Sequence, residues 1–247
     1  MARSLSALVG LIALAGVSAG AHAFIITPIY ITNITGTFSP QEQALVNQAA
    51  ADWTSRLSLG GGNNQNISVR FQLDHGGTDP NFGAFLGQWT YLTSGGSISS
   101  PYDSNITQVI TLNVDFLPQF YEGLAPPSPT DGYDVLTILR HELGHMLGFY
   151  PGLYSDANGD KWASHITGTT FDPAGLNVPM NADLAHTNVP GDLMYFSLPQ
   201  GIRRDVSDTN LQMLSLAEGY SVLPVPEPAA LSCLLPLAIT LLRRRRR

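Results

Sequence analysis

Alternating apolar and polar positions predict several β-strands in the first half of the chain. Residues 24–36, FIITPIYITNITG, are rich in β-branched side chains and alternate in polarity, which is typical of a half-buried strand. Residues 67–74, 87–94 and 106–116 are further apolar runs, each bounded by Gly, Asn, Ser or Pro. These four segments predict a β-sheet.

The pattern changes to a helical period in residues 39–57, SPQEQALVNQAAADWTSRL. Ser39 suits an N-cap, Pro40 suits the first helical position, and Gln43 follows as in a helix start. A strand followed by a helix therefore opens the predicted fold. The residues expected on the buried face of this helix are Ala44, Leu45, Ala49, Trp53 and Leu57.

A second helix is predicted after the Pro- and Ser-rich residues 125–132, APPSPTDG. Gly148 is the expected stop of this helix. The residues expected on its apolar face are Tyr133, Val135, Leu136, Ile138 and Leu139. The pattern therefore places the following motif, LRHELGHMLGF, on a helix.

His141 and His145 bracket Glu142 in this motif. Imidazoles four residues apart differ by about 40° around a helix, so both can reach one metal ion from the same face. Glu142 lies about 100° from its neighbour and can act as general base on a water that the ion activates. The alternative is an amphipathic helix with incidental histidines, which leaves a buried type of glutamate unexplained.

A catalytic zinc site requires a third protein ligand and an open fourth position. The histidine candidates in the mature region are His75, His165 and His186, beside assorted carboxylates. Another metal architecture takes a glutamate from a second helix, for which Glu218 in LQMLSLAEGY is the candidate. Leu211, Met213 and Leu214 already form an apolar stripe there, so Glu218 is expected to be a solvated helix terminus.

The segment HELGHMLGF resembles the metzincin signature HExxHxxGxxH through Gly148, although Pro151, which has no side-chain donor, occupies the position of the last ligand. Downstream, His186 precedes the sequence DLMY. This order resembles the leishmanolysin-like branch, in which a distant third histidine precedes a DLM or ELM turn. The resemblance covers about residues 134–220.

The resemblance implies that His186 is the third zinc ligand, with His165 as the alternative. It implies that Met194 forms the Met-turn beneath the metal and that Tyr195 is a candidate oxyanion stabiliser or a packing residue. The implied fold class is α+β, a metzincin-like zincin with a twisted mixed β-sheet, an active-site helix and a smaller C-terminal subdomain. In that family an edge strand pairs with the substrate backbone, and residues 87–96 are the candidate by order, or else an ordinary sheet strand.

The two ends of the chain are predicted to be processing signals. Residues 1–23 have an early basic residue, an apolar run and an Ala-His-Ala cleavage site, as in a secretory signal peptide; a retained anchor is the alternative. Residues 226–247 contain Pro-Glu-Pro, an apolar run and five arginines, which resembles the PEP-CTERM sorting tail of Gram-negative bacteria. An exosortase recognises and removes such a tail. The alternative is a plain tail anchor.

The catalytic domain is therefore predicted to span residues 24–225. Removing Arg3, the five terminal arginines and Glu227 from 12 basic and 19 acidic residues leaves a net charge of about −12. Such an acidic surface argues against nucleic acid as a partner and suits a secreted, monomeric protein. The expected processing partners are signal peptidase and exosortase, with transient membrane association through the tail and final release to the cell surface or matrix.

A calcium loop is a weaker expectation for YSDANGDKW, where Asp156, Asn158 and Asp160 space oxygen ligands. Lys161 occupies the position at which an EF-hand-type loop has glycine, so a solvated turn is the preferred interpretation.

The sequence predicts an exported zinc endopeptidase with a polypeptide substrate. The alternatives are a surface or matrix protein that keeps a zincin fold without hydrolysis, and a zinc hydrolase of a non-peptide bond.

Overall fold

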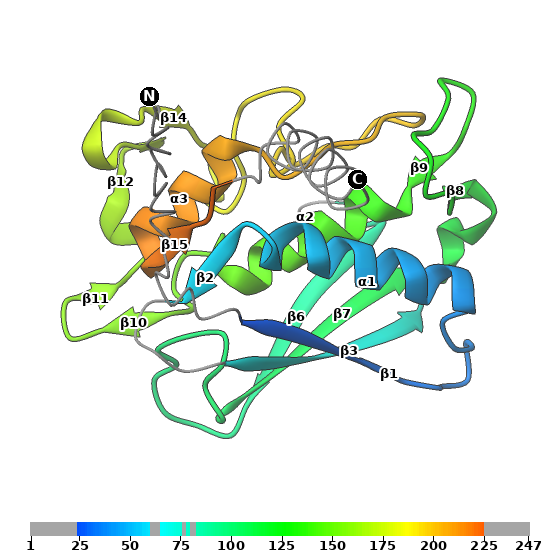
Figure 1. The fold of residues 1–247 in the computed structure, drawn as a ribbon, viewed down its shortest axis with the longest axis horizontal. Helices are drawn as coiled ribbons and strands as arrows, with labels where there is room; N and C mark the ends of the chain where they lie inside the picture. The colour runs from blue at the N-terminus through cyan, green and yellow to red at the C-terminus, as the bar shows by residue number, and fades with distance from the viewer. Residues whose placement is uncertain (1–23, 60–64, 76–77, 80–82, 225–247) are drawn as a thin grey trace, which may run out of the picture.

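The computed structural model describes residues 24–59, 65–75, 78–79 and 83–224. The predicted signal peptide and sorting tail lie outside these residues. Within them the protein is an α+β fold with a twisted mixed sheet and a few helices (Figure 1). No helix of the described segments is long and apolar enough to cross a bilayer.

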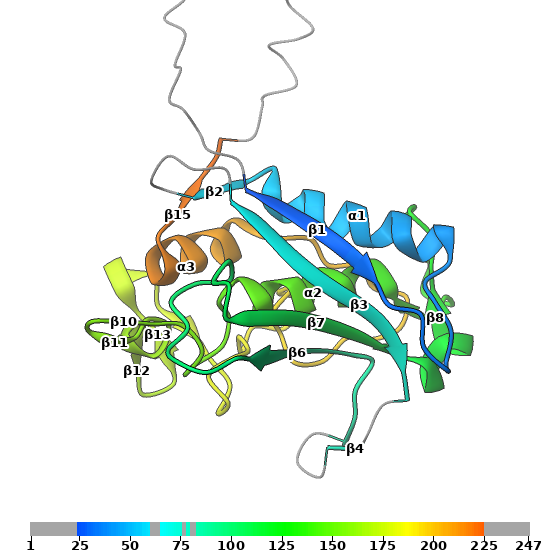
Figure 2. The ribbon, with the colours of Figure 1, turned by 90° about the horizontal axis from the view of Figure 1, so that it is seen from below.

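The main sheet has four strands in the order β1-β3-β7-β6 (Figure 2). The strands are β1 (Ile25–Tyr30), β3 (Asn66–Asp74), β7 (Ile106–Asn113) and β6 (Gly87–Thr93). β1, β3 and β7 run parallel, whereas β6 pairs antiparallel with β7 and forms an edge. The edge position expected for residues 87–96 is confirmed for β6, and its pairing with a substrate backbone stays a prediction.

Strands β3 and β6 follow the predicted apolar runs within one residue, whereas β1 covers only Ile25–Tyr30 of the predicted residues 24–36. Side chains of β3 alternate between exposed and buried positions, and the last six residues of β7 are all buried. The strand predicted over residues 106–116 was too long, because Asn113 accepts a hydrogen bond from the Asp115 N–H and starts a 3-10 turn, Val114–Gln119.

The first helix, α1 (Pro40–Thr54), begins at a capping box. The Ser39 hydroxyl accepts from the Glu42 N–H at 3.2 Å and the Glu42 carboxylate accepts from the Ser39 N–H at 2.6 Å, so the partner is Glu42 rather than Gln43. Two buried-face predictions were wrong: Ala44 is exposed, and Leu57 is buried in β2 (Leu57–Leu59) after the helix has ended.

The second helix, α2 (Val135–Leu147), is buried along most of its length. It packs with α1 on the same face of the sheet, as Figures 1 and 2 show together. The Trp53 indole N–H donates to the Arg140 carbonyl at 2.9 Å and so ties the two helices together. Tyr133 was predicted for the apolar face of this helix, but it lies before the helix, in β9 (Tyr133–Asp134).

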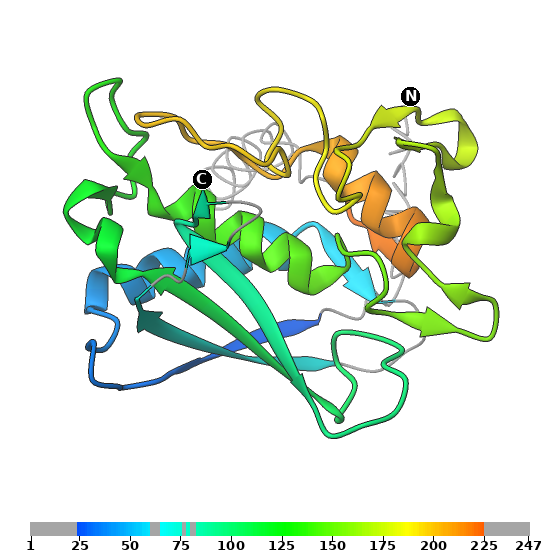
Figure 3. The same ribbon diagram turned by 180° about the vertical axis from the view of Figure 1, so that it is seen from behind.

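The chain after α2 contains short strands, turns and one further helix, α3 (Asp208–Glu218), which lie to one side of the sheet (Figure 3). Strand β15 (Tyr220–Val222) returns to pair with β2, so the end of the described chain is fixed beside the strand that follows α1. The remaining short strands are β4 (Thr78–Asp79), β5 (Gly83–Ala84), β8 (Phe120–Tyr121), β10 (Ser155–Asp156), β11 (Gly159–Asp160), β12 (Ile166–Thr167), β13 (Thr170–Phe171) and β14 (Val178–Pro179). Ala163–His165 and Pro173–Gly175 form 3-10 turns.

Candidate metal centre

The helix that carries the HELGH segment is fixed at both ends. The Asp134 carboxylate caps its start by accepting from the Thr137 N–H at 3.0 Å, and Arg203 pairs with the same carboxylate at 2.6 Å. Gly148 ends the helix with a φ of 140°, which a residue with a side chain rarely adopts. The Gly148 stop predicted from sequence is therefore confirmed.

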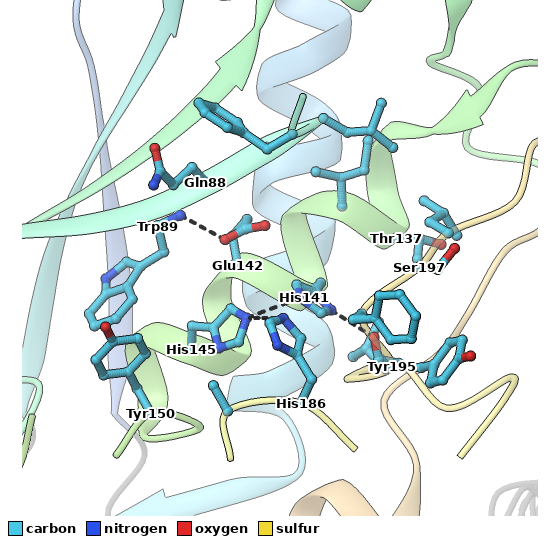
Figure 4. A pocket seen from close by; sticks show the side chains of 18 of the residues that line it. Gln88, Trp89, Thr137, His141, Glu142, His145, Tyr150, His186, Tyr195 and Ser197 are labelled. Atoms are coloured by element: carbon cyan, nitrogen blue, oxygen red, sulfur yellow. Dashed lines mark hydrogen bonds between the residues drawn. The ribbon is translucent and has the colours of Figure 1, made fainter. Parts of the chain in front are cut away.

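Three histidines meet at one point beside this helix. His141, His145 and His186 each offer a ring nitrogen, and these atoms all lie within 4.8 Å of one another, close enough to hold a metal ion. The His145 Nε2 lies 3.0 Å from the His141 Nε2 and 3.2 Å from the His186 Nε2. Figure 4 shows the three rings turned toward one another.

The outer nitrogen of each ring is held by an acceptor. The Nδ1–H groups of His141 and His145 donate to the carbonyls of Leu193 and Phe149 at 2.8 and 2.7 Å. The Nδ1–H of His186 donates to the Asp183 carboxylate at 2.7 Å. Since these partners can only accept, a ring that carries a single proton holds it on Nδ1 and keeps a lone pair on the inward Nε2.

The donor set fits a zinc ion. Three inward lone pairs would repel one another, whereas a central cation would satisfy all of them. Nitrogens in tetrahedral zinc sites, with Zn–N bonds of about 2.0–2.1 Å, lie about 3.3 Å apart, close to the spacing here. Burial and the neighbouring histidines lower the pKa of His141, and burial and His186 lower the pKa of His145 to about 3, so both rings are neutral.

Glu142 lies beside the three rings on the side of strand β6. Its carboxylate accepts from the Trp89 backbone N–H at 2.7 Å (Figure 4). Burial raises the pKa of Glu142 to about 8, which that hydrogen bond partly opposes. Gly87 allows the strand to approach the helix, because a Cβ there would lie 2.5 Å from the Ile138 Cγ2.

Met194 is fully buried beneath the helix. A Cβ on Gly144 would lie 2.6 Å from the Met194 Sδ, so the thioether packs directly against the helix backbone. The Met194 N–H donates to Asp192 at 2.9 Å, and the Asp192 carboxylate also accepts from Asn210 of α3. The turn is thus fixed by both the helix and α3.

The other ligand candidates lie elsewhere. His165 packs its ring 5.9 Å from Phe171, and His75 is largely exposed and contacts Asp115; neither belongs to the histidine group. Glu218 is not in this group either. The expectation that Glu218 is solvated was wrong, because its side chain is only 2% exposed and packs against Gly148 at the end of α2.

The candidate calcium loop is a β10–β11 hairpin. The Asp156 carboxylate accepts from the Asn158 N–H at 2.7 Å, as in a turn. The Asp160 carboxylate accepts from the N–H groups of Ala163 and Gly152. These hydrogen bonds agree with the preferred interpretation as a turn.

A cavity of about 880 Å³ opens over the histidines. Trp89, Tyr150 and Phe196 provide aromatic walls, and Tyr195 also lines it. The ring of Tyr195 packs 4.7 Å from Phe196, and its role at an oxyanion stays a prediction. Arg204 is the cationic side chain among the lining residues.

Sequence reasoning missed the residues that orient the site. Asp183 holds the His186 ring, and its place three residues before that histidine is the only local signal for it. The Trp89 N–H and the Arg204 guanidinium leave no sequence signal, because their positions depend on tertiary packing. No protein-family model matches the chain, and no curated protein matches it.

Proposed function

We propose that the protein is a zinc-dependent endopeptidase with a metzincin-like fold. The observation that carries this proposal is the convergence of three inward-facing Nε2 atoms beside a buried glutamate in an open cavity. His141, His145 and His186 would hold the ion, leaving the cavity side for substrate. When bound, zinc would act as a Lewis acid that lowers the pKa of water and polarises the scissile carbonyl.

Glu142 is the general base in this proposal. Its carboxylate would take a proton from the attacking water and then return that proton to the leaving amine. A pKa raised to about 8 by burial favours the protonated form, and a nearby cation favours the ionised form, so the carboxylate is suited to both steps near neutral pH. The Trp89 N–H, at 2.7 Å, orients it.

Strand β6 would bind the substrate backbone. It is an edge of the main sheet, and its residues from Gly87 to Tyr91 line the cavity. The Trp89 N–H is directed to Glu142, so this part of the strand borders the histidine group. An extended peptide can add to such an edge through main-chain hydrogen bonds, which would lay its scissile bond over the metal centre.

We also propose that the chain is exported from a Gram-negative bacterium. The support is the pattern of residues 1–23 and 226–247, and removal of both would release a single catalytic domain at the cell surface or in the matrix. Mass spectrometry of the mature protein tests this, since the proposal expects Phe24 at the N-terminus and loss of the terminal arginines. A mature protein with either segment intact would contradict that part.

The hydrolytic proposal is tested with the metal-free and zinc-reconstituted protein on casein, gelatin and aryl ester substrates. We expect zinc-dependent cleavage of the proteins, abolished by Glu142→Gln and kept by the control His165→Ala. Cleavage of esters alone would favour a hydrolase of non-peptide bonds. Bound zinc without hydrolysis of any substrate would favour a binding or structural protein.

A further inference from the structure

The cavity contains a buried positive charge that has no acidic partner. Arg204 is 7% exposed and lines the cavity. Its Nε has no hydrogen-bond partner, and its Nη1 donates only a long bond of 3.4 Å to the Tyr195 carbonyl. No carboxylate of the described residues lies within ion-pair distance of this guanidinium.

The other arginines of the described chain differ in this respect. Arg56, Arg140 and Arg203 each form an ion pair with an aspartate, and Arg70 is exposed to solvent. A guanidinium stays protonated in proteins, and burying its charge without a counter-ion costs free energy. Arg204 therefore lacks the compensation that the buried Arg140 has.

Neighbouring groups do not supply that compensation. Asp192 favours the charged form of Arg204 from beyond ion-pair distance, and its carboxylate oxygens accept from Thr187, Asn210 and the Met194 N–H instead of the guanidinium. The Tyr195 ring lies 5.6 Å from the guanidinium carbon and offers a cation–π contact only. A charged, planar donor thus remains open to an acceptor from the cavity.

The backbone fixes this residue beside the metal centre. The Arg204 N–H donates to the Thr137 hydroxyl and the Arg204 carbonyl accepts from Arg140, both at 2.9 Å. Thr137 precedes His141 by four residues, about 6 Å along the helix axis. Figure 4 shows Thr137 and Ser197 on the side of the site opposite Trp89, so the arginine is anchored at that end of the cavity.

We propose that Arg204 binds a carboxylate of the substrate next to the cleaved bond and makes the enzyme selective for acidic peptides. This inference rests on the proposed peptidase function. In an endopeptidase the carboxylate belongs to an Asp or Glu side chain; recognition of the free C-terminus of a short peptide would instead make the enzyme an exopeptidase. A guanidinium presents parallel N–H donors that match a carboxylate, and the buried site strengthens the pair.

The test uses the zinc-loaded protein and peptides that differ in one group. One pair carries Glu or Gln at each position flanking the cleaved bond, and the other carries a free or an amidated C-terminus. We expect the carboxylate form to have a kcat/KM about tenfold or more higher, mainly through a lower KM. The Glu/Gln pair reports a side-chain carboxylate, and the acid/amide pair reports the C-terminus.

Variants separate recognition from packing. Arg204→Gln should reduce the preference for the carboxylate peptide to less than about twofold, and Arg204→Lys should keep part of it through charge alone. The control is Arg70→Gln, which removes an exposed positive charge and should leave the preference unchanged. A wild type without preference for either carboxylate, or a folded Arg204→Gln that keeps the preference, would overturn the inference. The wild-type comparison decides even where a variant does not fold.

Binding to the Glu142→Ala protein, measured by calorimetry, distinguishes this inference from the peptidase proposal. Tighter binding of the carboxylate peptides that is lost with Arg204→Gln supports the inference even if the wild type cleaves nothing. Cleavage of neutral and acidic peptides at equal rates, with equal binding, refutes the inference and leaves the peptidase proposal intact.

Discussion

Replacing Glu218 by glutamine should remove a pH-dependent loss in the free energy of unfolding. The Glu218 side chain is 2% exposed, and neither carboxylate oxygen has a hydrogen-bond partner among the described residues. The Lys161 ammonium is 3.6 Å away, too far for a hydrogen bond of ordinary length. Burial raises the pKa of Glu218 from 4.5 to about 7, Lys161 opposes this, and Asp160 and Asp156 add to it.

The sign follows from proton binding. Between pH 4.5 and 7 the folded protein holds the Glu218 proton more tightly than the unfolded chain does, so stability falls as pH rises through this window. The pKa difference corresponds to at most about 3 kcal/mol. The amide that replaces the carboxyl group does not titrate, so the loss should be absent from the Glu218→Gln protein.

Urea denaturation of the metal-free wild type and Glu218→Gln, at pH 5 and pH 8, measures the effect. Contributions from titrating groups that do not interact with Glu218 are common to both proteins and cancel in the difference. We expect the free energy of unfolding of the wild type, relative to the variant, to fall by about 2–3 kcal/mol between these pH values. A difference that stays constant with pH would refute the burial argument.

Three further changes test the packing and orientation of the site. Asp183→Ala should weaken zinc binding about 10- to 100-fold in a chelator competition, because the His186 ring loses its acceptor; unchanged affinity would contradict this role. Gly144→Ala should cost about 1–3 kcal/mol in urea denaturation, because its Cβ meets the Met194 Sδ at 2.6 Å; a neutral result would show that the turn can move. Trp53→Phe should cost about 1–3 kcal/mol in the same assay, because a buried donor to α2 is lost; full stability would refute that link.

The sequence predicted the features that depend on local patterns. The strands over Asn66–Asp74 and Gly87–Thr93 and the helix Val135–Leu147 agree with apolar periods in the chain. His141 and His145 follow from spacing alone, since four residues bring them to one helix face. The resemblance to a distant-ligand metzincin pattern selected His186, and the structure brings this residue to the other two across 41 residues of separation.

Features that depend on tertiary packing could not be predicted in this way. Ala44 has the helical spacing of a core residue, yet its face of α1 is exposed to solvent. Glu218 lies at a helix end, where carboxylates are usually solvated, but Gly148 and Lys161 cover it. The unpaired charge of Arg204 depends on which acids reach it in space, and no period or motif encodes that.

The most direct test of the three-histidine centre is the metal content of the purified protein and two matched histidine variants. The account predicts one zinc ion per chain in the wild type and in His165→Ala, and loss of the ion in His186→Ala. Retention of zinc in His186→Ala, or its loss in His165→Ala, would contradict the ligand set, and a wild type that binds no zinc would contradict the central claim.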